Sequence, residues 1–215
     1  MFIEFVDSLR CPHPHAESWL VASAERMEGR DIVTGVLGCP VCKSQFAIAD
    51  GVADFRAAPA ARSGPPGPAR DAGDAERMAA LLDLTDDRGY AVLSGEWTVL
   101  GPAIRSLTGV HVMLVNPLNG IRMGGGISGM AVDDVLPLAP RSARGIALSA
   151  AATPQFLASA FRAVAPLGRV VAPVAVPVPR EVSELARDSD VWVGVNNAEP
   201  GAIVELRRTP PPATS

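Results

Sequence analysis

Lysine is nearly absent from this 215-residue sequence, and positive charge is not in excess. Lys43 is the only lysine, and 19 basic residues stand against 23 acidic ones, which gives a net charge of −4 and a pI near 5.4. Such a chain offers no domain-wide positive field for the phosphates of nucleic acid or for an anionic membrane surface. The composition therefore argues against nucleic acid or a membrane as a direct partner.

Long hydrophobic runs are missing as well. The most apolar segment, residues 163–179, is broken by one arginine and four prolines, whereas a membrane-spanning helix needs about 20 apolar residues. The first residues carry Glu4 and Asp7 where a signal peptide has a positive patch. We expect a soluble protein that stays in the cytoplasm.

Cysteine is rare, and its placement is informative. The three cysteines all lie within the first 42 residues. Three thiols cannot all pair, and in a reducing compartment a close group of thiols indicates metal binding before disulfides. Cys39 and Cys42 form a Cys-x-x-Cys pair, and Cys11 lies 28 residues earlier, next to His13 and His15.

These residues predict a structural zinc site. Zinc takes four thiolate or imidazole ligands in a tetrahedron, and a Cys-x-x-Cys turn supplies two of them. Cys11 supplies a third, and His13 or His15 must supply the fourth. We favour His15, because one residue between Cys11 and His13 leaves little chain to bring both onto one ion.

Two other interpretations of the cysteines are packing as small apolar residues and a redox pair. A redox motif has a strand before it and a helix after it, but a strand and a turn follow Cys42 in the sequence pattern. A module of about 55 residues with few large apolar side chains also needs a cross-link or a bound metal to fold, and zinc is a usual one. Zinc remains the preferred cofactor.

A segment rich in Ala, Pro and Gly divides the chain. It covers residues 57–75 and shows no apolar periodicity, which is typical of a linker. We therefore expect a zinc module in residues 1–56, a second domain in residues 76–208 and a disordered tail in residues 209–215.

The second domain alternates strand and helix patterns. Apolar runs of strand length begin at Tyr90, His111, Gly145 and Gly168. Helical patterns occur in residues 76–87, 154–166 and 179–189, and residues 191–208 have the pattern of a closing β-hairpin. This order predicts an α/β domain with an open, mostly parallel sheet and one antiparallel edge.

Residues 9–55 resemble a family of short zinc ribbons that activate transfer-RNA and protein methyltransferases, and the similar ribbons fused to bacterial methyltransferases. The second half follows the family pattern in register, at Gly35, Leu37, Cys39, Cys42, Phe46, Ile48, Asp50, Gly51, Val52 and Phe55. The first half departs from it, with a histidine in place of the second cysteine. The resemblance implies a protein partner or self-association through a hydrophobic face of the ribbon or the sheet edge.

Residues 76–208 resemble class I S-adenosylmethionine-dependent methyltransferases in the order of their elements. The local match covers residues 133–171, with a Leu-Pro pair, a strand, a helix and a Pro-x-Gly turn. The resemblance implies a Rossmann-like, seven-stranded, mostly parallel sheet that ends in an antiparallel hairpin. It also implies a cofactor site at the turn after the first strand of this sheet.

The residues at the cofactor positions differ from those of the family. The turn carries Ser94, Gly95, Glu96 and Trp97 in place of a glycine-rich loop, Asn116 replaces the acidic residue that holds the ribose, and Met130 replaces an aspartate beside the adenine. A carboxylate and a bulky ring stand where backbone amides must meet the ligand. We expect a degenerate pocket that does not bind S-adenosylmethionine and has no catalytic residue.

The sequence thus favours a zinc-binding protein with a non-catalytic methyltransferase-like domain, acting as a scaffold, a regulator or a partner subunit. An active methyltransferase with a divergent cofactor loop is the alternative, and an unrelated binding module on an α/β sheet is a third hypothesis. The glycine-rich segment 120–129 lacks the lysine of a phosphate loop. We interpret it as a mobile loop, and a substitute binding site is the other interpretation.

Overall fold

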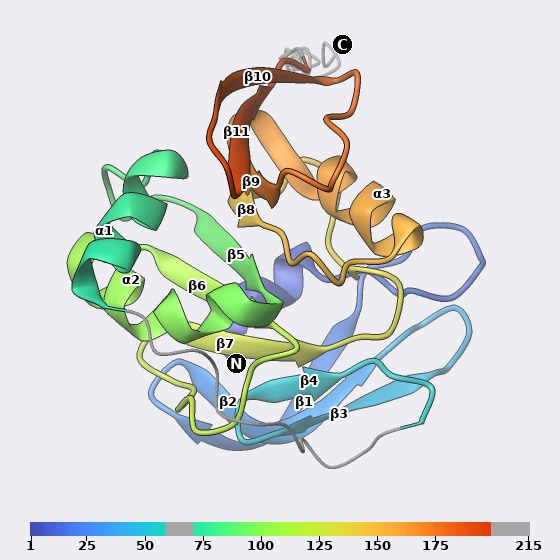
Figure 1. Ribbon diagram of the computed structural model, residues 1–215. Helices are drawn as coiled ribbons and strands as arrows, with labels where there is room; N and C mark the ends of the chain where they lie inside the picture. Colours follow the sequence, from blue (N-terminus) through green and yellow to red (C-terminus); the bar gives the residue numbers. More distant parts are fainter. Residues whose placement is uncertain (59–70, 199–215) are drawn as a thin grey trace, which may run out of the picture.

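The computed structural model describes residues 1–58 and 71–198, which are built around one large β-sheet (Figure 1). Its strands are β1 Val21–Glu28, β2 Asp31–Gly38, β3 Gln45–Ala49, β4 Val52–Asp54, β5 Tyr90–Ser94, β6 His111–Val115, β7 Ile127–Ala131, β8 Ala143–Ala147, β9 Val164–Pro173, β10 Val182–Arg187 and β11 Val191–Asn196. The helices are α1 Ala72–Leu81, α2 Gly101–Thr108 and α3 Pro154–Ala163, with 3-10 helices η1 Ile3–Ser8 and η2 Gly95–Leu100. None of these described helices is long and apolar enough to cross a membrane.

The eleven described strands follow the order β1-β2-β3-β4-β7-β6-β5-β8-β9-β11-β10. Five neighbouring pairs of these strands are parallel and five are antiparallel. The prediction of a small zinc-ribbon module beside a Rossmann-like, seven-stranded, mostly parallel sheet is therefore wrong. The reason is β4, which pairs in parallel with β7 and makes the N-terminal strands part of the same mixed sheet.

The seam at which β4 pairs with β7 depends on a glycine. Val52 lies opposite Gly129, and a Cβ atom on Gly129 would lie 2.7 Å from Cγ2 of Val52, closer than packed carbon atoms come. The Gly129 N–H donates to the Gly51 carbonyl at 3.2 Å, and the Phe55 N–H donates to the Ala131 carbonyl at 2.8 Å. The missing side chain at position 129 therefore allows β4 to reach the sheet.

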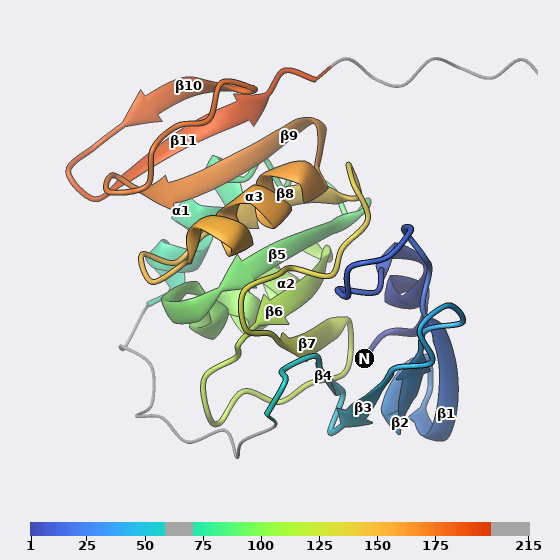
Figure 2. The ribbon, with the colours of Figure 1, turned by 90° about the vertical axis from the view of Figure 1, so that its right-hand side faces the viewer.

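Both faces of the central strands are covered. On one face, Met78 of α1 and Ile104 of α2 belong to one hydrophobic cluster. On the other face, α3 and the N-terminal segment share a second cluster that includes Phe5 and Phe156 (Figure 2). The ring of Phe5 packs edge-on against Tyr90 with the centroids 4.9 Å apart. The N-terminal segment and the rest of the chain therefore share a hydrophobic core.

Several elements predicted after the linker are present. The predicted strands appear as β5, β6, β8 and β9, and the helix predicted after Thr153 is α3. Thr153 caps α3, because its Oγ1 accepts a hydrogen bond from the Phe156 N–H at 3.2 Å. Helix α1 begins at Ala72, inside the predicted linker, since Asp71 and Asp74 form a capping box there.

The prediction for the C-terminal end is wrong in one element. Residues 179–189 carry a helical pattern, but β10 forms there and pairs with β11 in antiparallel fashion. Only Val182 of β10 is buried, so little packing holds a helix here and pairing with β11 decides the structure. Residues 202–208, predicted as the second strand of the hairpin, lie outside the described residues, as do the tail 209–215 and residues 59–70 of the linker.

Candidate metal centre

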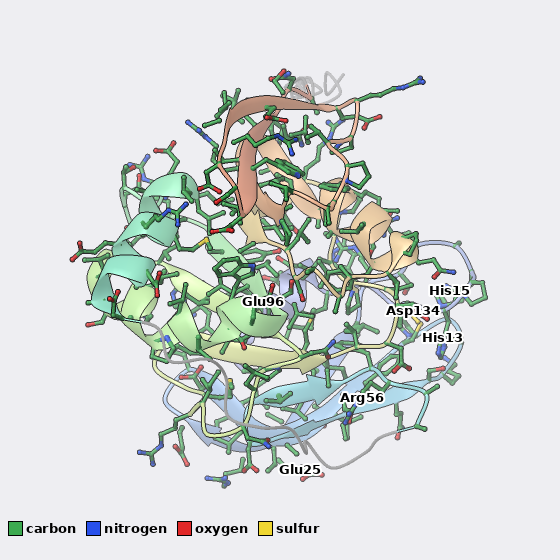
Figure 3. The ribbon with its side chains drawn as sticks, in the orientation of Figure 1. His13, His15, Glu25, Arg56, Glu96 and Asp134 are labelled. Carbon is green, nitrogen blue, oxygen red and sulfur yellow. The ribbon has the colours of Figure 1, made fainter. Side chains whose placement is uncertain are left out.

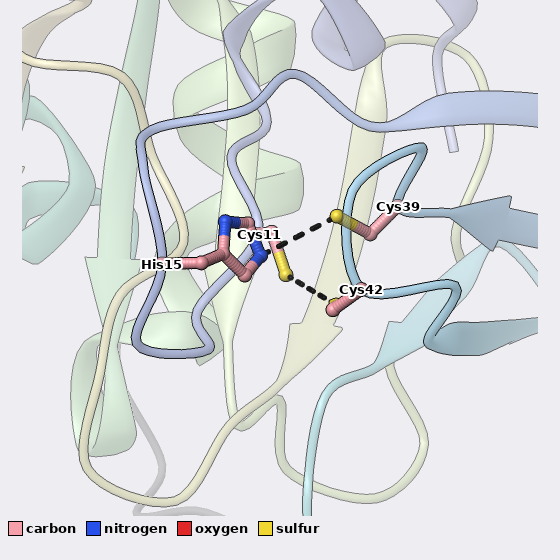
Figure 4. Close-up of side chains that lie close together, drawn as sticks. All are labelled: Cys11, His15, Cys39 and Cys42. Carbon is pink, nitrogen blue, oxygen red and sulfur yellow. Dashed lines mark hydrogen bonds between the residues drawn. The ribbon is translucent and has the colours of Figure 1, made fainter.

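Four metal-binding side chains meet from two segments that are far apart in the sequence (Figure 4). Cys11 and His15 lie on the loop before β1, and Cys39 and Cys42 lie on the turn between β2 and β3. Their donor atoms all lie within 4.8 Å of one another. This group could hold a metal ion.

The loop that carries Cys11 is fastened at both ends. The Arg10 N–H donates to the Pro137 carbonyl at 2.9 Å, and the Cys11 N–H donates to the Ser18 carbonyl at 3.0 Å. The guanidinium of Arg10 lies 3.6 Å above the ring of Trp19, a cation–π contact. These contacts fix the loop over residues 11–18 beside the sheet.

The Cys-x-x-Cys turn is closed by its own backbone. The Cys39 N–H donates to the Ser44 carbonyl at 2.9 Å, and the Lys43 N–H donates to the Cys39 carbonyl at 3.0 Å. Lys43 adopts the left-handed conformation with φ 63°, and Pro40 has the restricted φ that suits the second position of a turn. The turn therefore brings the sulfurs of Cys39 and Cys42 into one group.

Two of the distances between donor atoms match the edges of a tetrahedral metal site. Cys11 Sγ lies 3.6 Å from Cys42 Sγ, and Cys39 Sγ lies 3.5 Å from His15 Nε2. Metal–sulfur bonds of ~2.3 Å and a metal–nitrogen bond of ~2.0 Å give tetrahedral edges of about 3.8 Å between sulfurs and about 3.5 Å between sulfur and nitrogen. The two sulfurs are too far apart for a disulfide bond of ~2.05 Å.

His15 belongs to this group, and His13 has another partner. The His15 Nδ1–H donates to the Ala16 carbonyl at 2.6 Å, which leaves the lone pair on Nε2 directed at the Cys39 sulfur. Metal-binding histidines usually donate their other ring N–H in this way. His13 Nδ1 lies 2.9 Å from Ser44 Oγ and 3.7 Å from Cys42 Sγ. The arrangement is the one that the sequence spacing favoured.

Hydrogen bonds and burial move the thiol pKa values in opposite directions. The side chain and backbone of Ser44 lower the pKa of Cys42 to about 5, because they stabilise its thiolate. Burial raises the pKa of Cys11 to about 12. Since metal ligands are thiolates, Cys11 needs a cation beside it to ionise near neutral pH. Sequence reasoning missed Ser44, whose place two residues after Cys42 was the available signal.

The predicted cofactor turn after β5 is hydrogen-bonded to other parts of the chain, and its residues Glu96 and Trp97 line a cleft of 280 Å³. Glu96 accepts a hydrogen bond from Ser149 Oγ at 2.6 Å, and the Trp97 Nε1–H donates to the Leu148 carbonyl at 2.9 Å. Gly95 has φ 57°, and a Cβ atom there would lie 2.6 Å from Ser149 Oγ. The turn is therefore tied to the residues that follow β8.

The remaining residues of the predicted pocket make hydrogen bonds to the backbone or are buried in the core. Ser94 Oγ–H donates to the Ala147 carbonyl at 3.1 Å. Asn116 has φ 52°, and its Oδ1 accepts a hydrogen bond from the Val132 N–H at 2.9 Å. Met130 is fully buried. Figure 3 shows Glu96 well away from His13 and His15, so the turn and the metal-binding group are separate places in the fold.

The glycine-rich segment 120–129 leads into β7 and lines a cleft of 790 Å³ next to the ends of β1 and β2. Gly124, Gly125 and Gly126 all have positive φ angles, which suit residues without a side chain. The Gly125 N–H donates to Asp31 Oδ2 at 2.9 Å. The segment is therefore hydrogen-bonded to β2.

Comparisons with protein-family models and with curated proteins find no match for this chain. The zinc-ribbon and methyltransferase resemblances gain no support from them.

Proposed function

We propose that this chain is a zinc-binding protein in which Cys11, His15, Cys39 and Cys42 hold one structural zinc ion. The gathering of these four donor atoms within 4.8 Å of one another carries the proposal, and two of their distances match tetrahedral edges. Three thiolates and one imidazole suit zinc, whereas magnesium and calcium take oxygen ligands. With four protein ligands the site has no open position for a substrate, which is typical of structural zinc.

A zinc ion at this place links two segments that are far apart in the sequence. It connects the loop over residues 11–18 to the turn between β2 and β3. Cys39 is only 3% exposed and belongs to the same hydrophobic cluster as Leu37 and Phe46. The ion therefore supports the core of the N-terminal segment.

Two histidine variants separate the ligand from its neighbour. We expect His15→Ala to weaken zinc affinity by roughly 100-fold or more. Mutation of a residue that only hydrogen-bonds to a metal ligand already weakens metal affinity by about 10-fold to 100-fold. His13→Ala removes a contact to Ser44 and keeps one zinc per chain. Elemental analysis of both purified variants, followed by competition with a chromogenic chelator, measures this. Loss of zinc from His13→Ala with retention in His15→Ala would refute the ligand assignment.

We also propose that the rest of the chain is non-catalytic and serves as a scaffold, a regulator or a partner subunit. The carboxylate of Glu96 is engaged by Ser149, and Asn116 is engaged by the backbone of Val132, which supports a pocket without a cofactor. Trp19 and Val21 are 57% and 62% exposed beside the edge strand β1, which supports a protein partner. An active methyltransferase is the alternative.

S-adenosylmethionine is expected not to bind this chain at micromolar concentrations. Glu96 brings a carboxylate toward the cofactor's own carboxylate, and Asn116 lacks the charge-assisted hydrogen bonds worth about 1.5–3 kcal/mol, roughly tenfold to hundredfold in affinity. Isothermal titration calorimetry with the cofactor and with its demethylated product measures this, and Glu96→Gln serves as the variant without the charge. A dissociation constant in the micromolar range would support the active methyltransferase instead.

A further inference from the structure

The three sulfurs of the metal-binding group differ in their access to solvent. Cys42 is exposed, Cys11 is half-buried and Cys39 is buried. The neighbours of Cys42 at the tip of the turn, Val41 and Lys43, are exposed as well. Of the three cysteines, Cys42 is therefore the residue that a reagent in solution is expected to reach first.

The ligand set leaves negative charge on these sulfurs. Three thiolates and a neutral imidazole around a divalent zinc ion sum to a net charge of −1. Lys43, the cation nearest to Cys42 in the sequence, directs its Nζ to the Pro40 carbonyl at 2.7 Å. The thiolate is the nucleophilic form of cysteine, so a ligand set that keeps Cys42 ionised also keeps it reactive.

Hydrogen bonds lower the nucleophilicity of the Cys42 sulfur. Ser44 Oγ lies 3.2 Å from Cys42 Sγ, and His13 Nδ1 lies 2.9 Å from Ser44 Oγ. When Cys42 is a thiolate, only the hydroxyl can donate in this contact, and the His13 N–H can donate to the hydroxyl in turn. A hydrogen bond that stabilises a thiolate lowers its nucleophilicity. Ser44 therefore sets how fast Cys42 reacts.

We propose that Cys42 is a site of S-alkylation, at which small, soft alkylating electrophiles react with a metal-held thiolate. The proposal rests on the proposed zinc site. A lone pair of Cys42 Sγ forms a bond to the electrophilic carbon, the bond from that carbon to its leaving group breaks, and the leaving group departs with the electron pair. No oxidant and no proton transfer are needed. The product is a neutral thioether, a weaker ligand, so the reaction also releases the metal.

Iodoacetamide on the zinc-loaded full chain tests the proposal. Peptide mapping by mass spectrometry at short times gives the rate at each cysteine, and a chromogenic chelator follows zinc release. We expect Cys42 to react at least about tenfold faster than Cys11 and Cys39, with one zinc released for each alkyl group added. A zinc-loaded chain in which the three cysteines react at one rate, or in which Cys11 reacts first, would overturn the proposal.

Two variants at position 44 test the moderating hydrogen bond. Ser44→Ala removes the hydroxyl that lies 3.2 Å from Cys42 Sγ, and is expected to speed alkylation of Cys42 by about threefold to tenfold. Ser44→Thr keeps a hydroxyl and is expected to react as the unaltered chain does. Zinc content is measured on each sample first, so a chain without zinc refutes the proposed function, whereas a zinc-loaded chain with an unreactive Cys42 refutes only this inference.

Discussion

Cys39→Ser is expected to lose the metal and to lower the melting temperature by about 10 °C. Loss of a metal site belongs to the few single changes that cost ~4 kcal/mol or more, and each kcal/mol is worth about 2–4 °C in a chain of this size. The effect is large because Cys39 is buried in the N-terminal core. Its loss frees the loop over residues 11–18 and leaves a polar hydroxyl among apolar side chains.

Differential scanning calorimetry with and without a strong chelator measures this effect. The chelator should lower the melting temperature of the unaltered chain and leave Cys39→Ser unchanged. Val41→Ser is the matched control, because Val41 lies on the same turn but is 55% exposed and offers no ligand. Equal melting of Cys39→Ser and the unaltered chain, both insensitive to the chelator, would show that the site contributes no stability.

Gly129→Val is expected to destabilise the whole sheet by about 1–3 kcal/mol through overpacking at the seam between β4 and β7. The first atom of the new side chain would lie 2.7 Å from Cγ2 of Val52. Neither strand can move aside easily, since β7 is also paired with β6 and β4 with β3. The variant therefore loses contacts between the N-terminal strands and the rest of the sheet.

A double-mutant cycle with Val52→Ala tests the cause. Shortening Val52 makes room, so the double variant should be more stable than the sum of the single effects by at least about 1 kcal/mol. Urea unfolding monitored by circular dichroism gives the four free energies. Additive effects on the free energy of unfolding would mean that contact between residues 129 and 52 is not the cause of the destabilisation.

The metal-binding group was predictable because its signal is local. Cys39 and Cys42 sit in one turn, and Cys11, His13 and His15 sit in one loop, so spacing indicates three cysteines and one of two histidines as donors. The fit of Thr153 and Pro154 to a helix start is equally local. Such signals depend on a few neighbouring residues and hold whatever tertiary structure the rest of the chain adopts.

The sheet as a whole was not predictable in the same way. β4 is only three residues long, and its partner β7 begins 75 residues after β4 begins, so no sequence pattern marks their pairing. β10 likewise depends on β11, because its exposed residues carry no apolar alternation. The hydrogen bond between Ser149 and Glu96 joins two turns after different strands, and only the fold brings these residues together.

The most direct test of the zinc site is the X-ray absorption spectrum of the purified full chain at the zinc edge. We expect a first shell of three sulfur atoms at ~2.3 Å and one nitrogen atom at ~2.0 Å from the metal, with the outer-shell pattern of an imidazole ring from His15. The same sample should contain one zinc per chain by elemental analysis. A shell made only of oxygen and nitrogen, a shell with fewer than three sulfurs, or a chain that holds no zinc would contradict the proposed metal centre.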